Sequence, residues 1–283
     1  MWIGLVGSEM CIRDSWFATR NISEPSAYNI PTIFKIDGPL DVTRLSTAIH
    51  NVLQQHSALM TQFQDAGNGL NIRFSPVTEN VVEYIKEKEG VDSEQLLKNE
   101  ISTDLKLGFE AESPLYRCRL YQLGSEQHIL TLCIHHAIAD GWSMGIIFRQ
   151  LSALFNGENA PAPSDYYQYV RRLGIDSPSE KSATQVAFWR DYLANAKELT
   201  PIAAAPDKTR FGSKRLVLEQ NTVNRLKKVV ADTVQGGTLF QGLLACFALT
   251  LHRFCDSDDI LIGTDVANRN TPELENMVGL LVN

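Results

Sequence analysis

The sequence predicts an α/β protein that folds as two lobes. Extended and helical patterns alternate along the 283 residues, as in mixed α/β folds. This length is near the upper limit for one hydrophobic core. The pattern breaks at the proline-rich residues 160–164 and the polar residues 174–182, and then starts again. We therefore expect a first lobe over residues 16–178 and a second, partial lobe over residues 179–283.

The composition is that of an ordinary globular protein, with 44% hydrophobic and 21% charged residues. A net charge of −7 argues against nucleic acid or an anionic membrane as the main partner. No apolar run reaches the roughly 18 residues of a membrane span. The five cysteines are scattered and lack CxxC spacing, which favours a reducing cytoplasm and excludes a cysteine-rich zinc site.

Residues 1–15, MWIGLVGSEMCIRDS, do not resemble the rest of the chain. The apolar stretch Trp2–Val6 is too short for the core of a signal peptide and has no basic residue before it. It also lacks a helical or strand period. We interpret residues 1–15 as a non-native leader; the alternative is a genuine flexible N-terminus.

The first lobe opens with an extended run, Ile30–Asp37, which Gly38 and Pro39 end as a turn. A helix is expected next, from Asp41 as its N-cap to about His56, because apolar residues recur at intervals of three and four. These residues are Leu45, Ala48, Ile49, Val52 and Leu53.

Residues 59–64 and 70–74 flank the sequence DAGNG, whose glycines predict a β-hairpin turn. A second helix begins at Asp92 or Ser93 and is expected to turn three apolar side chains inward. These side chains are Leu96, Leu97 and Ile101.

Two strong strands follow, Leu115–Leu123 and His128–His136. In the first strand, alternation places Tyr116, Cys118 and Leu120 on one face, and Arg117, Arg119 and Tyr121 on the other. The second strand is apolar at nearly every position, which predicts a central strand. After the short loop AIADG, residues 142–157 are expected to form a helix that ends at Gly157.

The second half is predicted to contain helices over residues 183–197, 222–234 and 236–253. An extended pattern occupies residues 209–219, and residues 260–264 are expected to form a buried strand. Residues 277–283, MVGLLVN, begin a further strand and end without a turn or polar tail. We therefore expect this chain to be a fragment of a longer protein.

The segment HHAIADG, residues 135–141, carries the most chemistry. It lies where a buried strand passes into a helix, the position at which α/β proteins expose functional groups. Neighbouring strand residues point to opposite faces, so one of His135 and His136 can enter a pocket while the other is satisfied inside. Imidazole can take and return a proton near neutral pH. Asp140 can fix the loop through an arginine or a backbone amide, and Gly141 lets the backbone N–H approach a ligand.

Other interpretations of these residues are weaker. Both histidines can simply be hydrogen-bonded at the end of a strand. Residues 141–145 match GxSxG, but Ser143 falls in the first helical turn and not at a hydrolase elbow, so we assign it to helix N-terminal hydrogen bonding. His136 and Asp140 have ligand-like spacing without a third metal ligand nearby.

Two further residues also have ordinary explanations. Cys133 lies among apolar strand residues, where a thiol is inert. Arg269, in the polar stretch ANRN after a buried strand, can help to shape a site, but we favour its interpretation as a solvated loop charge.

The segment HHAIADGWS resembles the HHxxxDG motif of the condensation domains of nonribosomal peptide synthetases, which are related to chloramphenicol acetyltransferase. The likeness extends over about residues 16–283. It includes SAYNIPTIFKIDGPLDVTRLSTAIHNVLQQHSALMTQF, QVAFWRDYL, LLACFALTLHRFCDSDDILIGTDVANRN and VGLLVN.

The resemblance implies a chloramphenicol acetyltransferase-like fold of two α/β lobes with a tunnel between them, the second lobe being incomplete here. It implies an acyltransferase that joins a carrier-bound donor thioester to the amine of a carrier-bound acceptor. The partners would be donor and acceptor peptidyl carrier domains, which supply phosphopantetheine arms, and an adjacent adenylation domain. No bound cofactor or metal is implied.

The same resemblance implies roles for individual residues. His136 would face the tunnel, where it either accepts the amine proton or orients the amine, and the Gly141 N–H would lie near the developing oxyanion. His135 and Asp140 would be architectural. The motif RHExLRTxF reads QHSALMTQF here, with Met60 in place of an arginine that pairs with the aspartate, which puts that ion pair in doubt.

Amide formation is therefore the leading functional hypothesis, and four alternatives remain. The chain can be an epimerisation domain or an acyltransferase that uses a small thiol or alcohol. It can also be a non-catalytic carrier-docking fragment, given Met60 and the incomplete lobe. The serine-hydrolase hypothesis, which depends on Ser143, is the weakest.

Overall fold

The computed structural model describes residues 26–65, 70–86, 93–110, 112–175, 180–196, 215–255 and 257–282. Within them the chain separates into two compact units. The first comprises Met1–Ser182 together with Asp265–Asn283, and the second comprises Ala183–Thr264. The predicted leader and the hairpin turn at 66–69 lie outside the described residues. The lobes predicted over 16–178 and 179–283 stay a prediction, although residues 265–282 belong to the first unit.

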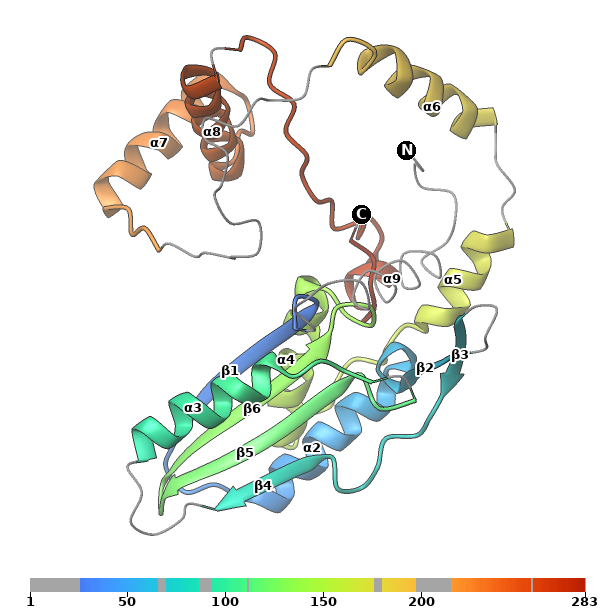
Figure 1. Ribbon diagram of the computed structural model, residues 1–283, viewed down its shortest axis with the longest axis vertical. Helices are drawn as coiled ribbons and strands as arrows, with labels where there is room; N and C mark the ends of the chain where they lie inside the picture. Colours follow the sequence, from blue (N-terminus) through green and yellow to red (C-terminus); the bar gives the residue numbers. More distant parts are fainter. Residues whose placement is uncertain are drawn as a thin grey trace. The chain divides into compact units, whose positions relative to one another are not determined.

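The first unit is built on a four-stranded sheet with the order β1-β6-β5-β4 (Figure 1). The strands are β1 (Asn29–Asp37), β4 (Val82–Lys86), β5 (Tyr116–Gly124) and β6 (Gln127–His135). β6 pairs antiparallel with both β1 and β5, so it is a central strand, as its apolar sequence predicted. β4 joins the edge of the sheet in parallel with β5.

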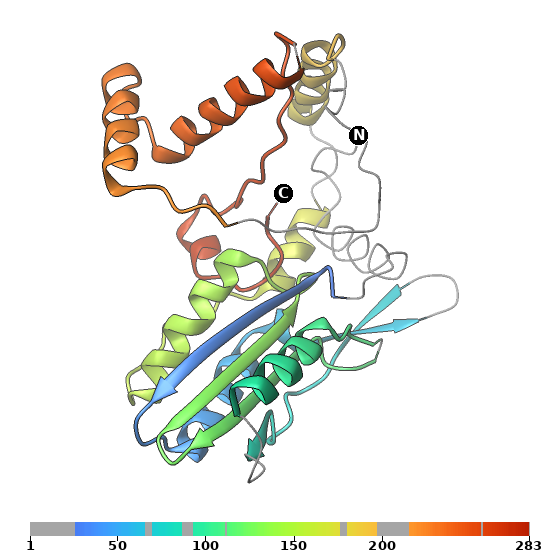
Figure 2. The ribbon, with the colours of Figure 1, turned by 60° about the vertical axis from the view of Figure 1, so that its left-hand side comes forward.

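Three helices cover this sheet, namely α2 (Val42–Gln55), α3 (Ser93–Lys106) and α4 (Gly141–Phe155). α2 and α4 lie on one face and α3 lies on the other (Figures 1 and 2). The alternation along β5 separates the two faces. Cys118 and Leu120 belong to the main core with α2 and α4, whereas Tyr121 packs with Ile101 of α3. The predicted alternation is therefore confirmed.

The helix α2 begins and packs as its sequence predicts. Asp41 is its N-cap, with Oδ1 accepting a hydrogen bond from the Arg44 N–H at 2.9 Å. The five apolar residues of the predicted stripe are its buried residues. Burial of each Leu, Ile or Val side chain of this stripe stabilises the fold by about 1.5–3 kcal/mol. The stripe therefore holds α2 on the sheet.

Smaller elements complete the first unit. They are η1 (Ser57–Met60), β2 (Thr61–Asp65), β3 (Leu70–Phe74), α5 (Tyr166–Ile175) and α9 (Pro272–Glu275). β2 and β3 pair antiparallel, which confirms the predicted hairpin. Tyr166 and Tyr167 of α5 are buried in the main core. They anchor a helix that the sequence pattern did not predict.

The structure corrects two expected strands. Residues 260–264 were expected to form a buried strand, but they pair with no strand in the described chain, and Leu261 is exposed. Residues 277–282 also form no strand, although Met277, Val278, Leu280 and Leu281 are buried in the main core. An apolar sequence predicts that a segment is buried. A strand also requires a neighbouring strand that hydrogen-bonds to its backbone, and an apolar run does not predict that neighbour.

The second unit contains α7 (Gln220–Thr233) and α8 (Leu239–Cys255), and α6 (Glu180–Tyr192) begins just before it. α7 and α8 approach closely at Gly242, where an added Cβ would lie 2.6 Å from Cγ2 of Val230. Val230 is the only large apolar residue recorded as buried in the described part of this unit. Exposed ones include Phe240, Leu243, Phe247, Leu249 and Phe254 of α8.

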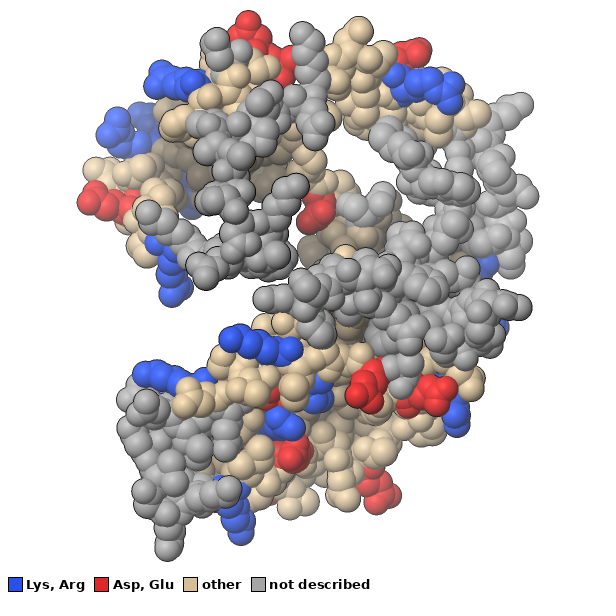
Figure 3. Space-filling view, viewed as in Figure 1, with Lys and Arg blue, Asp and Glu red and all other residues tan. Residues whose placement is uncertain are grey.

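Basic and acidic side chains are interspersed over the first unit on the face shown in Figure 3. That face therefore presents no large field of one sign of the kind that typifies a nucleic-acid surface. Among the described helices, none combines the length and the apolar character that a membrane span requires.

Candidate active site

The loop between β6 and α4, residues 136–140, presents two neighbouring histidines in different environments. His135 is the last residue of β6 and is fully buried, whereas the next residue, His136, is only partly buried. Backbone hydrogen bonds hold both residues: the His135 N–H donates to Leu115 O at 2.9 Å, and the His136 N–H donates to Tyr28 O at 2.7 Å. Only His136 of this pair therefore has access to solvent.

His135 is held in its neutral form by its surroundings. Burial, and to a lesser extent the neighbouring His136, lowers the pKa of His135 to about 4. Its Nδ1 accepts a hydrogen bond from the Ala137 N–H at 3.1 Å, so this nitrogen carries no proton. Tyr28 stacks on the ring with centroids 6.2 Å apart, and Phe109 meets it edge-on at 5.9 Å. His135 therefore shapes the turn that contains His136.

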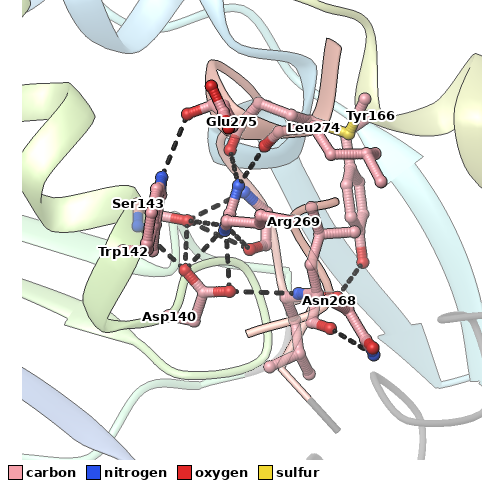
Figure 4. Close-up of polar contacts among 12 residues, drawn as sticks. Asp140, Trp142, Ser143, Tyr166, Asn268, Arg269, Leu274 and Glu275 are labelled. Atoms are coloured by element: carbon pink, nitrogen blue, oxygen red, sulfur yellow. Dashed lines mark hydrogen bonds and ion pairs between the residues drawn. The ribbon is translucent and has the colours of Figure 1, made fainter. Parts of the chain in front are cut away.

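The other end of the loop is fixed by Asp140. Asp140 is the N-cap of α4, and its Oδ1 accepts hydrogen bonds from the backbone N–H and the hydroxyl of Ser143 at 2.8 and 2.7 Å. Its Oδ2 accepts a hydrogen bond from the Leu281 N–H at 3.2 Å. Asp140 therefore joins the loop both to α4 and to the segment at 277–281 (Figure 4).

Arg269 is the ionic partner of Asp140, which corrects the interpretation of this arginine as a solvated loop charge. Its Nη2 lies 2.8 Å from Oδ1 and 2.9 Å from Oδ2 of Asp140. The guanidinium also donates to the carbonyl oxygens of Leu274 and Met277, and the ring of Trp142 lies 5.8 Å away (Figure 4). The carboxylate thus neutralises this buried charge, and both terminal nitrogens of the guanidinium are hydrogen-bonded.

Met60 does not supply the ion pair that the resemblance had put in doubt. Met60 is the last residue of η1 and packs partly buried against the main core. The carboxylate of Asp140 nevertheless has an arginine partner, which comes from a position 129 residues later in the chain. The polar stretch around Arg269 was visible in the sequence. A buried aspartate needs a cation nearby, and this requirement was the one sequence signal that could have suggested Arg269 as the partner of Asp140.

Ser143 is not arranged as a hydrolase nucleophile. Its side chain is fully buried, and its hydroxyl bonds to Asp140, Gly279 and Arg269 rather than to a histidine. It lies in the first turn of α4, not at a sharp turn directly after the strand. The simpler prediction, hydrogen bonding at the helix N-terminus, is confirmed by the bond from the Ser143 N–H to Asp140.

Gly141 is the first residue of α4 and has open space beside it. A Cβ built on Gly141 would meet no heavy atom of the described residues within 4 Å. The backbone at this end of the loop can therefore be approached closely, which its predicted contact with a reacting oxygen requires. Nothing in the described residues tests that contact.

Cys133 and the proposed metal spacing offer no competing chemistry. Burial raises the pKa of the Cys133 thiol to about 11, which keeps it protonated. The carboxylate of Asp140 is engaged by Arg269 and does not act as a ligand together with His136. In the part of the chain that the structure describes, no three His, Cys, Asp or Glu residues are grouped to hold a metal ion.

Solved structures share this fold. The first condensation domain of the calcium-dependent antibiotic synthetase, in complex with a substrate analogue, matches with a TM-score of 0.74 and 21% identity. The match covers 99% of this chain and 68% of that one. A four-domain nonribosomal peptide synthetase bound to AMP and glycine matches with a TM-score of 0.80 and 21% identity, over 98% of this chain and 21% of that one. The predicted chloramphenicol acetyltransferase-like α/β fold is thereby confirmed.

Curated relatives are peptide synthetases much longer than this chain. A linear gramicidin synthase of Brevibacillus parabrevis is 29% identical over 288 residues, which are 95% of this chain and 6% of the relative. Cyclosporin synthetase of Tolypocladium inflatum is 28% identical over 286 residues, which are 95% of this chain and 2% of the relative. The condensation-domain family matches residues 11–283. This match shows that the chain belongs to the condensation-domain family.

Proposed function

We propose that this chain forms an amide bond between a donor acyl group and the amine of an acceptor, each carried as a thioester. The observation that supports this most directly is the asymmetry of the histidine pair. His135 is sealed and neutral, whereas His136 stays partly accessible, five residues before an open backbone position at Gly141. Membership of the condensation-domain family and the names of the gramicidin and cyclosporin synthetases support the same reaction.

The reaction needs one nucleophile, one electrophile and a place for one proton. The acceptor nitrogen attacks the donor carbonyl carbon, a C–N bond forms, and the C–S bond of the thioester breaks. The donor thiolate takes up a proton, which balances the proton that the amine loses. His136 would accept the amine proton or orient the amine, because an accessible imidazole can do either near neutral pH.

The backbone N–H of Gly141 would stabilise the negative charge that develops during the reaction. A tetrahedral centre places charge on the former carbonyl oxygen, and an N–H group at a helix N-terminus is suited to stabilise it. Gly141 is the first residue of α4, where no preceding helical turn uses its N–H. Holding the two substrates together would contribute further, since well-oriented reactions gain on the order of 7–11 kcal/mol.

The partners follow from this chemistry. We propose that donor and acceptor peptidyl carrier domains present the substrates on phosphopantetheine arms, and that an adenylation domain loads them. The four-domain synthetase that shares this fold supports such an arrangement, as do the long synthetases among the relatives. The chain itself would need no bound cofactor for acyl transfer.

The test is a dipeptide-forming assay with two loaded carriers and the full-length protein that contains this chain. His136→Ala is expected to reduce product formation at least about a hundredfold, the order of general acid–base contributions. His50→Ala removes another partly buried histidine, located in α2, and serves as the matched control. Product formation that His136→Ala leaves unchanged would overturn the role of His136. Binding of loaded carriers without product from the unaltered protein would favour a docking module instead.

A further inference from the structure

Ser143 joins two distant segments through a single buried oxygen atom. Its hydroxyl lies 2.7 Å from Oδ1 of Asp140 and 3.0 Å from the carbonyl oxygen of Gly279, to either of which it can donate. It accepts from the Gly279 N–H at 3.1 Å and from Nη2 of Arg269 at 3.2 Å. A hydroxyl has one hydrogen and two lone pairs, so this oxygen is fully used.

The segment that Ser143 holds is fixed from its other side by α5. A Cβ built on Gly279 would lie 2.2 Å from Cδ2 of Tyr166, so the backbone and the aromatic ring are in close contact. The Tyr166 hydroxyl donates to the carbonyl oxygen of Leu280 at 3.0 Å. Residues 279 and 280 are therefore clamped between α4 and α5, and Ser143 is bonded to a fixed point.

The same hydroxyl acts on the loop that carries the histidine. The loop is held at its start by the hydrogen bonds from Ala137 and Ile138 to His135. At its end it is held by Asp140, whose Oδ1 receives both the backbone and the side-chain hydrogen bond of Ser143. Ser143 therefore shares with Arg269 and the Leu281 N–H the task of orienting the Asp140 carboxylate, and it adds the bonds to the first turn of α4.

We propose that Ser143 is a positioning residue for the amide-forming site. This inference rests on the proposed function. Ser143 is fully buried and so offers no surface to a substrate. It acts through Asp140, by keeping His136 and the Gly141 N–H in the geometry that the reaction needs. A displacement of about 1 Å in such a site can reduce the rate on the order of a hundredfold.

The test compares Ser143→Ala with Ser152→Ala in the dipeptide-forming assay. Ser152 lies on the same helix and is exposed, so its variant removes a hydroxyl without touching the loop. Rates are expressed per folded molecule, with folding measured by circular dichroism and by the unfolding midpoint. Ser143→Ala is expected to lower kcat roughly tenfold to a hundredfold, with KM for both loaded carriers changed by less than about twofold.

The outcomes separate a positioning role from a merely structural one. A lower unfolding midpoint with unchanged kcat per folded molecule overturns the proposal, and so does an effect confined to KM. If Ser143→Ala does not fold, Ser143→Cys takes its place under the same criteria, since a thiol is similar in size and bonds more weakly. His136→Ala is measured in parallel. Full activity of that variant overturns the role proposed for His136, and the absence of dipeptide from the unaltered protein overturns the proposed function. An inactive His136→Ala beside a fully active Ser143→Ala overturns only the present inference.

Discussion

The carboxylate of Asp140 and the guanidinium of Arg269 form a buried ion pair between residues 129 positions apart in the sequence. The two side chains are only 4% and 1% exposed. Inside a protein each of these charges requires the other, because neither is solvated by water. The pair therefore fastens the end of the HHxxxDG loop to the segment that follows the second unit.

Removing one partner of this pair is expected to be strongly destabilising. Arg269→Met leaves the buried carboxylate of Asp140 without its cation, and we expect the free energy of unfolding to fall by about 3–5 kcal/mol. Urea unfolding measures this change. The control is Arg172→Met, which removes an exposed ion pair with Glu273 and is expected to cost at most about 1 kcal/mol.

A double-mutant cycle separates the pair from other effects of the substitution. Asp140→Asn combined with Arg269→Met removes both charges, so its cost is expected to be clearly below the sum of the two single variants. Equal costs for the buried and the exposed pair, or strictly additive costs in the cycle, would contradict the coupling described here.

Gly279 is expected to tolerate no side chain. Gly279→Ala places a Cβ within 2.2–2.7 Å of three ring carbons of Tyr166, and neither the clamped backbone nor the buried ring can easily move. We expect a loss of about 1–3 kcal/mol in unfolding free energy, typical of overpacking. Gly145→Ala is the matched control, since its Cβ meets nothing within 4 Å in the described structure and alanine favours helices. Similar stabilities of the two variants would argue against the clamp.

Local sequence patterns predicted the elements whose burial follows a simple period. The stripe of α2 and the apolar run of β6 are both of this kind, and both were found as expected. β4, with the sequence VEYIK, was missed because it is short and partly charged, and it exists as a strand through its parallel pairing with β5. Local pattern alone carries no information about such a partner.

The same distinction applies to the candidate site. HHxxxDG is contiguous, so His135, His136 and Asp140 could be selected from the sequence together with their expected environments. The pairing of Arg269 with Asp140 could not be predicted, because the neighbours of Arg269 in the chain resemble an ordinary polar loop and its partner is remote. Opposite charges that are far apart in the sequence, such as Asp140 and Arg269, can be recognised as partners only when the fold has brought their segments together.

His135 is expected to make stability depend on pH in the acidic range. Its pKa is about 4 in the folded protein, against an ordinary value of 6.5 in the unfolded chain. Between these values the unfolded chain binds a proton that the folded protein does not. The free energy of unfolding therefore falls as the pH is lowered from about 6.5 to about 4, by roughly 3 kcal/mol at most, and His135 has no such effect above that range.

Urea unfolding at pH 7 and pH 4.5 measures this dependence. His135→Asn is the informative variant, because an amide oxygen can accept the hydrogen bond of the Ala137 N–H and does not titrate. Burial also lowers the pKa of His56, so part of the pH dependence is expected to remain in this variant. A variant as sensitive to acid as the unaltered protein would show that His135 is not responsible.

Gly141→Ala is expected to separate activity from stability. The added methyl group meets no described atom within 4 Å, and the residue does not have a positive φ, so the fold should accept alanine at the start of α4. The methyl group would instead occupy the space through which a reacting oxygen approaches the backbone N–H. Loss of one such donor typically reduces kcat about 10²–10³-fold. We therefore expect a large loss of dipeptide formation with an unfolding midpoint close to that of the unaltered protein. Gly145→Ala, one turn further along α4, controls for the substitution itself and should keep its activity. Equal activity of the two variants would remove Gly141 from the proposed site.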